Sequence, residues 1–164
     1  MIPNHLNSLI TTSFCPSSPA VYFFVPGKAA PGGSKTAFGF KRANGSIGAR
    51  IIDAGKNNKQ WRAVVSLEAK GAMTAPPLTG PVVARAVFVV ARPKSHLNSK
   101  GQVKPSAPPF PTTKPDATKL WRAVEDAMTG IVWIDDAQVI HQSVSKVYGD
   151  TPGVHVAAYQ CNVG

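Results

Sequence analysis

The sequence predicts an α+β (mixed α/β) domain, in which two main helices pack on a small mixed sheet. Two segments have the i, i+3, i+4 spacing of apolar residues that is typical of an amphipathic helix. Three others are short, apolar and rich in β-branched residues, which is the composition of strands. The chain of 164 residues is long enough for one domain with a buried core. We expect helices over 59–70 and 116–129, strands over 21–25, 81–92 and 154–161, and one or two extended segments over 131–148.

The helix over 116–129 has the clearest pattern. Pro115 precedes it, Asp116 stands at its start, and Gly130 follows as a stop signal. Its buried face should hold Leu120, Ala123, Val124, Ala127 and Met128. Lys119, Arg122 and Asp126 share one flank beside that apolar face, whereas Glu125 is expected to be solvated.

The other elements fix the outline of the domain. Asn57 or Asn58 caps the earlier helix, whose buried face should hold Trp61, Val64, Val65 and Ala69. The segment 81–92 is nearly continuously apolar, which predicts a central strand that is covered on both faces. Residues 1–20 have no sustained period and are expected to be a loose extension. The domain itself then covers 21–164.

The charge balance favours a polyanionic partner. Lys and Arg number 18 against 8 Asp and Glu, which gives a formal net charge of +10. Nucleic acid fits this balance better than a membrane, because no apolar run is long enough to span a bilayer. A soluble basic protein without such a partner is the alternative.

The two cysteines, Cys15 and Cys161, lie near the two ends of the chain and form no CxxC pair. This spacing disfavours a structural zinc site. A single disulfide between them is formally possible, but nothing else in the sequence indicates secretion. We expect a cytoplasmic protein.

Glycine and basic residues alternate through 27–55. Glycine allows the backbone to come close to a ligand, and the basic side chains supply charge. A phosphate-binding nucleotide loop is excluded because Gly33 stands where that loop requires Lys, so no nucleotide cofactor is expected. The segment is either a loop or hairpin that contacts a nucleic-acid backbone, or a solvated hairpin. The expected DNA contacts are Lys28, Lys35, Lys41 and Arg42, with Lys119 on the later helix.

A polar, proline-rich loop without acidic residues is expected over 93–113. It carries Lys94, Lys100 and Lys104 and leads directly into the acidic stretch. A loop of this length is usually functional or disordered, and its charge makes it a candidate DNA-contacting flap. Phe110 either inserts between bases or anchors the loop in the core, and the second interpretation is preferred.

Five of the eight acidic residues lie within 114–139. The helix from Asp116 rises ~18 Å, and an extended chain covers the same distance in five or six residues. A strand that runs straight back would therefore bring Asp135 or Asp136 to the level of Asp116. Such carboxylates could hold Mg²⁺ against a DNA phosphate. In the alternative, Asp116 caps the helix, Asp126 pairs with Arg122, and Asp135–Asp136 form a turn.

The run KPDATKLWRAVEDAM, with DDAQV after it, resembles the RusA family of Holliday junction resolvases. That family's pattern is a basic residue, Pro, Asp, any residue and Asp-Asn-Leu, then Lys, Asp-Ala-Leu and later Asp-Asp-x-Gln-Val. APGGSKTAF and NKQWRAVV upstream are also similar to members from phages, and the resemblance covers most of 21–160. It implies a homodimeric, Mg²⁺-dependent (Mn²⁺ being an alternative) endonuclease that nicks branched double-stranded DNA at four-way junctions.

The resemblance also implies roles for individual residues. Asp116 and Asp136 match the family's metal-site acids, with Asp135 beside the second. Arg122 matches a catalytic Lys, and Asp126 matches the Asp of Asp-Ala-Leu. Thr118 stands where the family has a second acid, so one negative charge is lost. The implied catalytic residues are Asp116, Asp136 and Arg122, and the implied metal ligands are Asp116, Asp136, Asp135 and Asp126.

Overall fold

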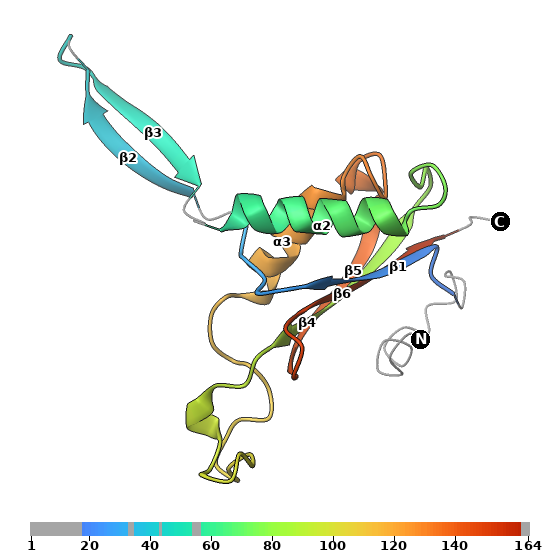
Figure 1. Ribbon diagram of the computed structural model, residues 1–164. Helices are drawn as coiled ribbons and strands as arrows, with labels where there is room; N and C mark the ends of the chain where they lie inside the picture. The colour runs from blue at the N-terminus through green and yellow to red at the C-terminus, as the bar shows by residue number, and fades with distance from the viewer. Residues whose placement is uncertain (1–17, 33–34, 43, 54–56, 162–164) are drawn as a thin grey trace.

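The computed structural model describes residues 18–32, 35–42, 44–53 and 57–161. Within these ranges the chain forms one four-stranded sheet, a separate two-stranded hairpin and two α-helices (Figure 1). The α+β class predicted from the sequence is confirmed. The residues 1–17 of the expected extension, including Cys15, lie outside the described ranges.

The sheet has the strand order β1-β6-β4-β5. Its strands are β1 (Val21–Pro26), β4 (Val82–Val90), β5 (Val139–Tyr148) and β6 (Gly153–Gln160). β6 is antiparallel to β1 and to β4, whereas β4 and β5 are parallel. The mixed sheet with β4 at its interior is therefore confirmed, and β5 forms an edge.

Both helices cover one face of this sheet. They are α2 (Asn58–Ala72) and α3 (Ala117–Met128), and their apolar faces join a core with the inward residues of the strands. The predicted buried face of α3 is confirmed, and Trp121 is buried as well. On α2, Val64 is 38% exposed, so its expected burial was wrong. Trp61 is a core residue, which leaves it unable to stack on a base.

The opposite face of the sheet has a smaller apolar cluster of Val83, Ala157, Tyr159 and Cys161. Arg85, which interrupts β4, is buried with its guanidinium 4.8 Å from the centre of the Tyr159 ring. Because β4 has strand neighbours on both edges and buried residues on both faces, its near-continuous apolar sequence is explained.

Two segments project from the body formed by the sheet and helices (Figure 1). One is the hairpin of β2 (Lys35–Lys41) and β3 (Ile47–Asp53), which confirms a hairpin within 27–55. The other is the connection 91–113 between β4 and α3, which includes the short 3-10 helix η1 (Lys94–His96). None of the helices in the described ranges is long and apolar enough to cross a membrane.

Candidate active site

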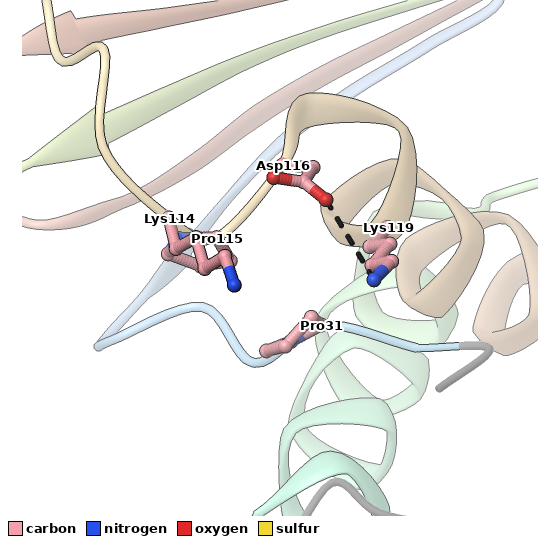
Figure 2. Close-up of a pocket in the computed structure, with 5 residues that line it drawn as sticks. All are labelled: Pro31, Lys114, Pro115, Asp116 and Lys119. Atoms are coloured by element: carbon pink, nitrogen blue, oxygen red, sulfur yellow. Dashed lines mark ion pairs between the residues drawn. The ribbon is translucent and has the colours of Figure 1, made fainter. Parts of the chain in front are cut away.

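Asp116 is the residue immediately before α3, with an extended backbone at φ −70° and ψ 142°. This is the usual conformation of an N-cap residue, yet the Asp116 side chain accepts no capping hydrogen bond. Its carboxylate instead forms an ion pair with Lys119, at 3.6 Å between Oδ2 and Nζ (Figure 2). At 56% exposure for the Asp116 side chain and 50% for that of Lys119, the pair is open to solvent. The carboxylate therefore stays accessible to a ligand.

A pocket of about 410 Å³ lies in front of this carboxylate. Figure 2 shows its lining, which consists of Pro31, Lys114, Pro115, Asp116 and Lys119. Two lysines and one aspartate leave the lining with a net positive charge, and the N-terminus of α3 adds a partial positive charge. The electrostatics of this pocket therefore suit an anionic group such as a DNA phosphate.

A second cavity of about 370 Å³ shares Lys114 and Pro115 with the first, and Lys28 contributes to its lining. The segment that carries Lys28 is held against α3 by a hydrogen bond from the Gly32 amide to the Lys119 carbonyl (2.7 Å). The structure thus brings Lys28 to the end of α3 where Asp116 lies, as a DNA contact would require. Lys114, which was not among the predicted site residues, is shared by both cavities.

The other predicted DNA contacts lie on the β2–β3 hairpin, away from these two cavities, or outside the described part of the chain. Lys41 and Arg42 are exposed at the turn of the β2–β3 hairpin, where the Arg42 amide donates to the Ser46 carbonyl (2.8 Å). The side chain of Lys35 lies outside the described part of the chain.

Lys146 on β5 holds the chain just before Asp116. Its Nζ donates to the carbonyl oxygens of Thr113 (2.8 Å) and Pro115 (3.0 Å). The sequence had given no indication of this role, because the contact joins residues more than thirty positions apart. Lys146 is therefore a positioning residue that sequence patterns did not identify.

The expected return of the chain from Gly130 straight along α3 was wrong. Residues 130–133 form a tight turn in which the Gly130 amide donates to the Trp133 carbonyl (2.7 Å). The short 3-10 helix η2 (Asp136–Gln138) follows, and β5 begins only at Val139. As a result, the strand residue that reaches the level of Asp116 is Lys146 rather than Asp135 or Asp136.

Asp135 and Asp136 lie near the far end of α3. Asp135 caps η2, with its carboxylate accepting from the Ala137 amide (2.8 Å) while Gln138 Oε1 accepts from the Asp135 amide (2.9 Å). The alternative that places this pair in a turn is therefore correct. Asp136 is exposed and makes no capping contact of its own within the described residues.

Asp126 faces the other helix. Its carboxylate lies 3.5 Å from the Arg62 guanidinium of α2, so it pairs with Arg62 rather than with Arg122. Arg122 is exposed on α3. The ion pair between α2 and α3 directs Asp126 away from the pocket around Asp116.

Glu125 is the acidic residue whose surroundings the sequence misjudged. It is half-buried rather than solvated. Burial raises the pKa of its carboxyl, the charges of Asp136 and Asp126 raise that pKa further, and the nearby Trp121 indole N–H and the Arg122 guanidinium oppose the shift. Asp136 therefore lies within electrostatic range of Glu125. At ~1.5 Å per residue, Glu125 is roughly 14 Å along the helix axis from the start of α3.

Among the described residues, no group of three or more Asp, Glu, His or Cys side chains could hold a metal ion. Mg²⁺, however, commonly takes only one or two carboxylates, with water and phosphate completing its coordination. The accessible, uncapped carboxylate of Asp116 fits that kind of site. Asp135 fits less well, because the Ala137 amide already occupies one of its oxygens. Asp126 also fits less well, because its side chain is less exposed than that of Asp116, at 39% against 56%, and it joins α3 to α2 through Arg62.

Comparison with known proteins identifies the family of this chain. The family described as endodeoxyribonuclease RusA matches residues 33–159, which include α2, α3, η2 and most of the sheet. The chain is also 33% identical over 115 residues to an uncharacterized protein of Bacillus subtilis (strain 168), YqaN, a match that covers 69% of this chain and 79% of that protein. Since the family match spans most of the chain, this protein belongs to the RusA endodeoxyribonuclease family.

Proposed function

We propose that this protein is a metal-dependent, structure-selective endonuclease that hydrolyses phosphodiester bonds at four-way junctions and other branched DNA. The observation that carries the proposal is the accessible Asp116 carboxylate in a basic pocket at the start of α3. Membership of the RusA endodeoxyribonuclease family gives the class of reaction. The net charge of +10 supplies the long-range attraction for DNA. We further propose that the protein acts as a homodimer on the two-fold junction.

The residues around the pocket have separate tasks in this proposal. Lys114 and Lys119 bind the phosphate that enters the pocket, and Lys28 binds the adjacent backbone from the neighbouring cavity. Lys146 fixes the carbonyls of Thr113 and Pro115, and thereby the position of Asp116.

Charge that develops on the phosphoryl oxygens needs a cation that is already in place. Arg122 is proposed for this task because it is exposed on α3 and cannot lose its charge near neutral pH. Asp116 is the proposed ligand of Mg²⁺ or Mn²⁺, with water and phosphate completing the coordination. Asp136 lies beside Glu125, near the other end of α3, and is not assigned to the same ion. When bound, the metal would supply Lewis-acid polarisation of the scissile phosphate.

The test is a nicking assay on a synthetic four-way junction, with linear duplex of the same sequence as the comparison substrate. The purified protein should nick the junction with Mg²⁺ or Mn²⁺ and not with EDTA. Asp116→Asn should abolish nicking while junction binding is retained. Glu68→Gln on α2 is the control for loss of one carboxylate. A folded protein that binds junctions but never cuts them, with either metal, would contradict the proposal.

A second candidate is a branched-DNA-binding protein of the same fold that has lost its chemistry. Two observations favour it. Thr118 replaces an acid of the family pattern, and the described residues contain no group of three metal-binding side chains. Binding of junctions without cleavage, in the assay above, would select this candidate.

A further inference from the structure

The connection 91–113, which we call the arm, is ordered without a core of its own. Asn98 organises it, because the Asn98 Oδ1 accepts from the amides of Lys100 (2.9 Å) and Gln102 (2.9 Å). Leu97 and Val103 pair across the two limbs of the arm. Every residue from 91 to 110 is exposed or only partly buried. The long loop expected over 93–113 therefore has hydrogen-bonded structure of its own.

The base of the arm is fastened to the end of β5. The Arg92 guanidinium lies 4.1 Å from the centre of the Tyr148 ring, and its Nη1 donates to the Pro108 carbonyl (3.0 Å). The His96 ring meets the same Tyr148 ring edge-on at 5.8 Å between centroids. Arg92 thus joins both limbs of the arm to the sheet.

The arm is basic, and no Asp or Glu occurs anywhere between Glu68 and Asp116. Lys94 and Lys100 are exposed on it. An ordered, solvent-exposed protrusion that holds cations and no carboxylate repels other cationic surfaces and attracts a polyanion. This composition favours DNA over a second copy of this basic chain as the partner of the arm.

Phe110 is the large aromatic residue that the arm exposes, at 61%. The expectation that it anchors the loop in the core was wrong. Pro109 and Pro111 flank it, and Pro111 is buried, so the backbone that presents the ring has little freedom. An exposed aromatic ring on a basic segment is the combination on which single-stranded bases stack. Phe110 is also only six positions before Asp116 in the chain.

We propose that the arm binds DNA beside the branch point and that Phe110 stacks on a base whose own stacking is interrupted there. This inference rests on the proposed function, since it supplies the selectivity for branched over linear DNA. Lys94 and Lys100 contact phosphates of the adjoining duplex. The pocket around Asp116 then receives a phosphate next to the base that Phe110 holds.

The test measures equilibrium binding in EDTA, so that no cleavage is needed, with a four-way junction and a linear duplex. Phe110→Ala removes one base stack and should therefore weaken junction binding about tenfold. Binding of the duplex should change by less than about twofold, because the bases inside a linear duplex are already stacked on both faces. Phe110→Trp should restore junction binding. Leu67→Ala removes another exposed apolar side chain, 68% exposed on α2, and should leave both affinities unchanged.

A second measurement tests the cations of the arm. The Lys94→Ala, Lys100→Ala double variant should reduce the magnitude of the slope of log K against log salt by roughly 1.8, for the junction and for the duplex. Equal junction binding by Phe110→Ala and wild type would overturn the stacking role alone. A change of sedimentation from dimer to monomer in Phe110→Ala would also overturn it, by assigning the ring to a second copy. A wild-type protein that binds no branched DNA would overturn the proposed function together with this inference.

Discussion

The Nζ of Lys146 lies 3.0 Å from the carbonyl oxygen of Pro115, the residue directly before Asp116. The same ammonium group also holds the Thr113 carbonyl at 2.8 Å. Lys146 is near the end of the edge strand β5, so the sheet itself sets where the base of the arm ends and α3 begins. The position of Asp116 therefore depends on a strand residue that is distant in sequence.

Replacing Lys146 with Met should loosen this part of the site. Hydrogen bonds to a charged donor contribute about 1.5–3 kcal/mol each when well shielded, and partial exposure lowers that here, so we expect a stability loss of about 1 kcal/mol. Junction nicking should fall by more than this loss explains, because Asp116 is no longer held. Thermal unfolding and nicking at saturating DNA check the two effects. Lys70→Met on α2 is the control for charge, and an equal effect of both variants would show that Lys146 acts only through net charge.

Gly32 is where the glycine-rich segment touches α3. A Cβ atom at this position would lie 3.0 Å from the Ala123 amide nitrogen and 3.1 Å from its Cα, which are backbone atoms that cannot move aside freely. Gly32→Ala should therefore destabilise the protein by about 1–3 kcal/mol, as overpacking does.

Gly71, near the end of α2, provides the matched control for Gly32. A Cβ there would meet nothing within 4 Å, so Gly71→Ala should stabilise the helix by roughly 0.5–1 kcal/mol. Denaturant unfolding of the two variants should give shifts of opposite sign. Two shifts of the same sign would contradict the close approach of Gly32 to α3.

Glu125→Gln should raise the stability at neutral pH. Burial and the charge of Asp136 raise the pKa of Glu125 in the folded state, so ionisation of this carboxyl disfavours folding. The stability that the raised pKa of Glu125 contributes is fully present below the unfolded-state pKa, and it is lost as the pH rises through the folded-state pKa. At pH 7 we expect a small gain in the free energy of unfolding, because solvent screens the partly exposed carboxyl, and at pH 4 the gain should nearly vanish.

Thermal melts of Glu125→Gln and wild type between pH 4 and pH 8 check this dependence. Glu68→Gln makes the same change of charge on α2 and controls for the net charge of the protein. A stability difference that is constant across the pH range would contradict the raised pKa of Glu125.

Sequence patterns predicted the elements whose side chains face the core. The period of the apolar residues gave α3 to within a residue at each end, and the apolar composition of 81–92 gave a strand at the interior of the sheet. These patterns work because burial acts on one face of a helix, or on both faces of a central strand, and leaves a regular trace in the sequence.

The positions of the acidic residues could not be predicted in the same way. The turn over 130–133 is closed by backbone hydrogen bonds and η2 by a capping box, neither of which has an apolar period. Asp126 was assigned to the flank of Arg122, whereas its partner Arg62 comes from α2 through the packing of the two helices. Exposure of Phe110 likewise follows from the anchoring of the arm by Arg92, a contact between residues far apart in the chain.

Thr118 is exposed in the first turn of α3, which contains no acidic residue. Thr118→Asp should therefore have two effects. A carboxylate at a helix N-terminus contributes about 0.3–1 kcal/mol to stability. This gain involves no metal ion, so it should be the same with and without EDTA. If Asp116 is a metal ligand, a second carboxylate two residues away should also tighten Mn²⁺ binding, because it adds a hard oxygen donor of opposite charge.

Calorimetric titration of Mn²⁺ and thermal melts, with and without the metal, separate these two effects of Thr118→Asp. Thr118→Asn is the matched control, because it places an oxygen at the same position without the charge and should give neither a tighter metal site nor the dipole contribution. Cleavage that appears only in Thr118→Asp would identify the wild-type protein as a branched-DNA-binding protein. If the wild type cleaves junctions well and Thr118→Asp cleaves them equally well, the reaction at Asp116 requires no acidic residue at position 118.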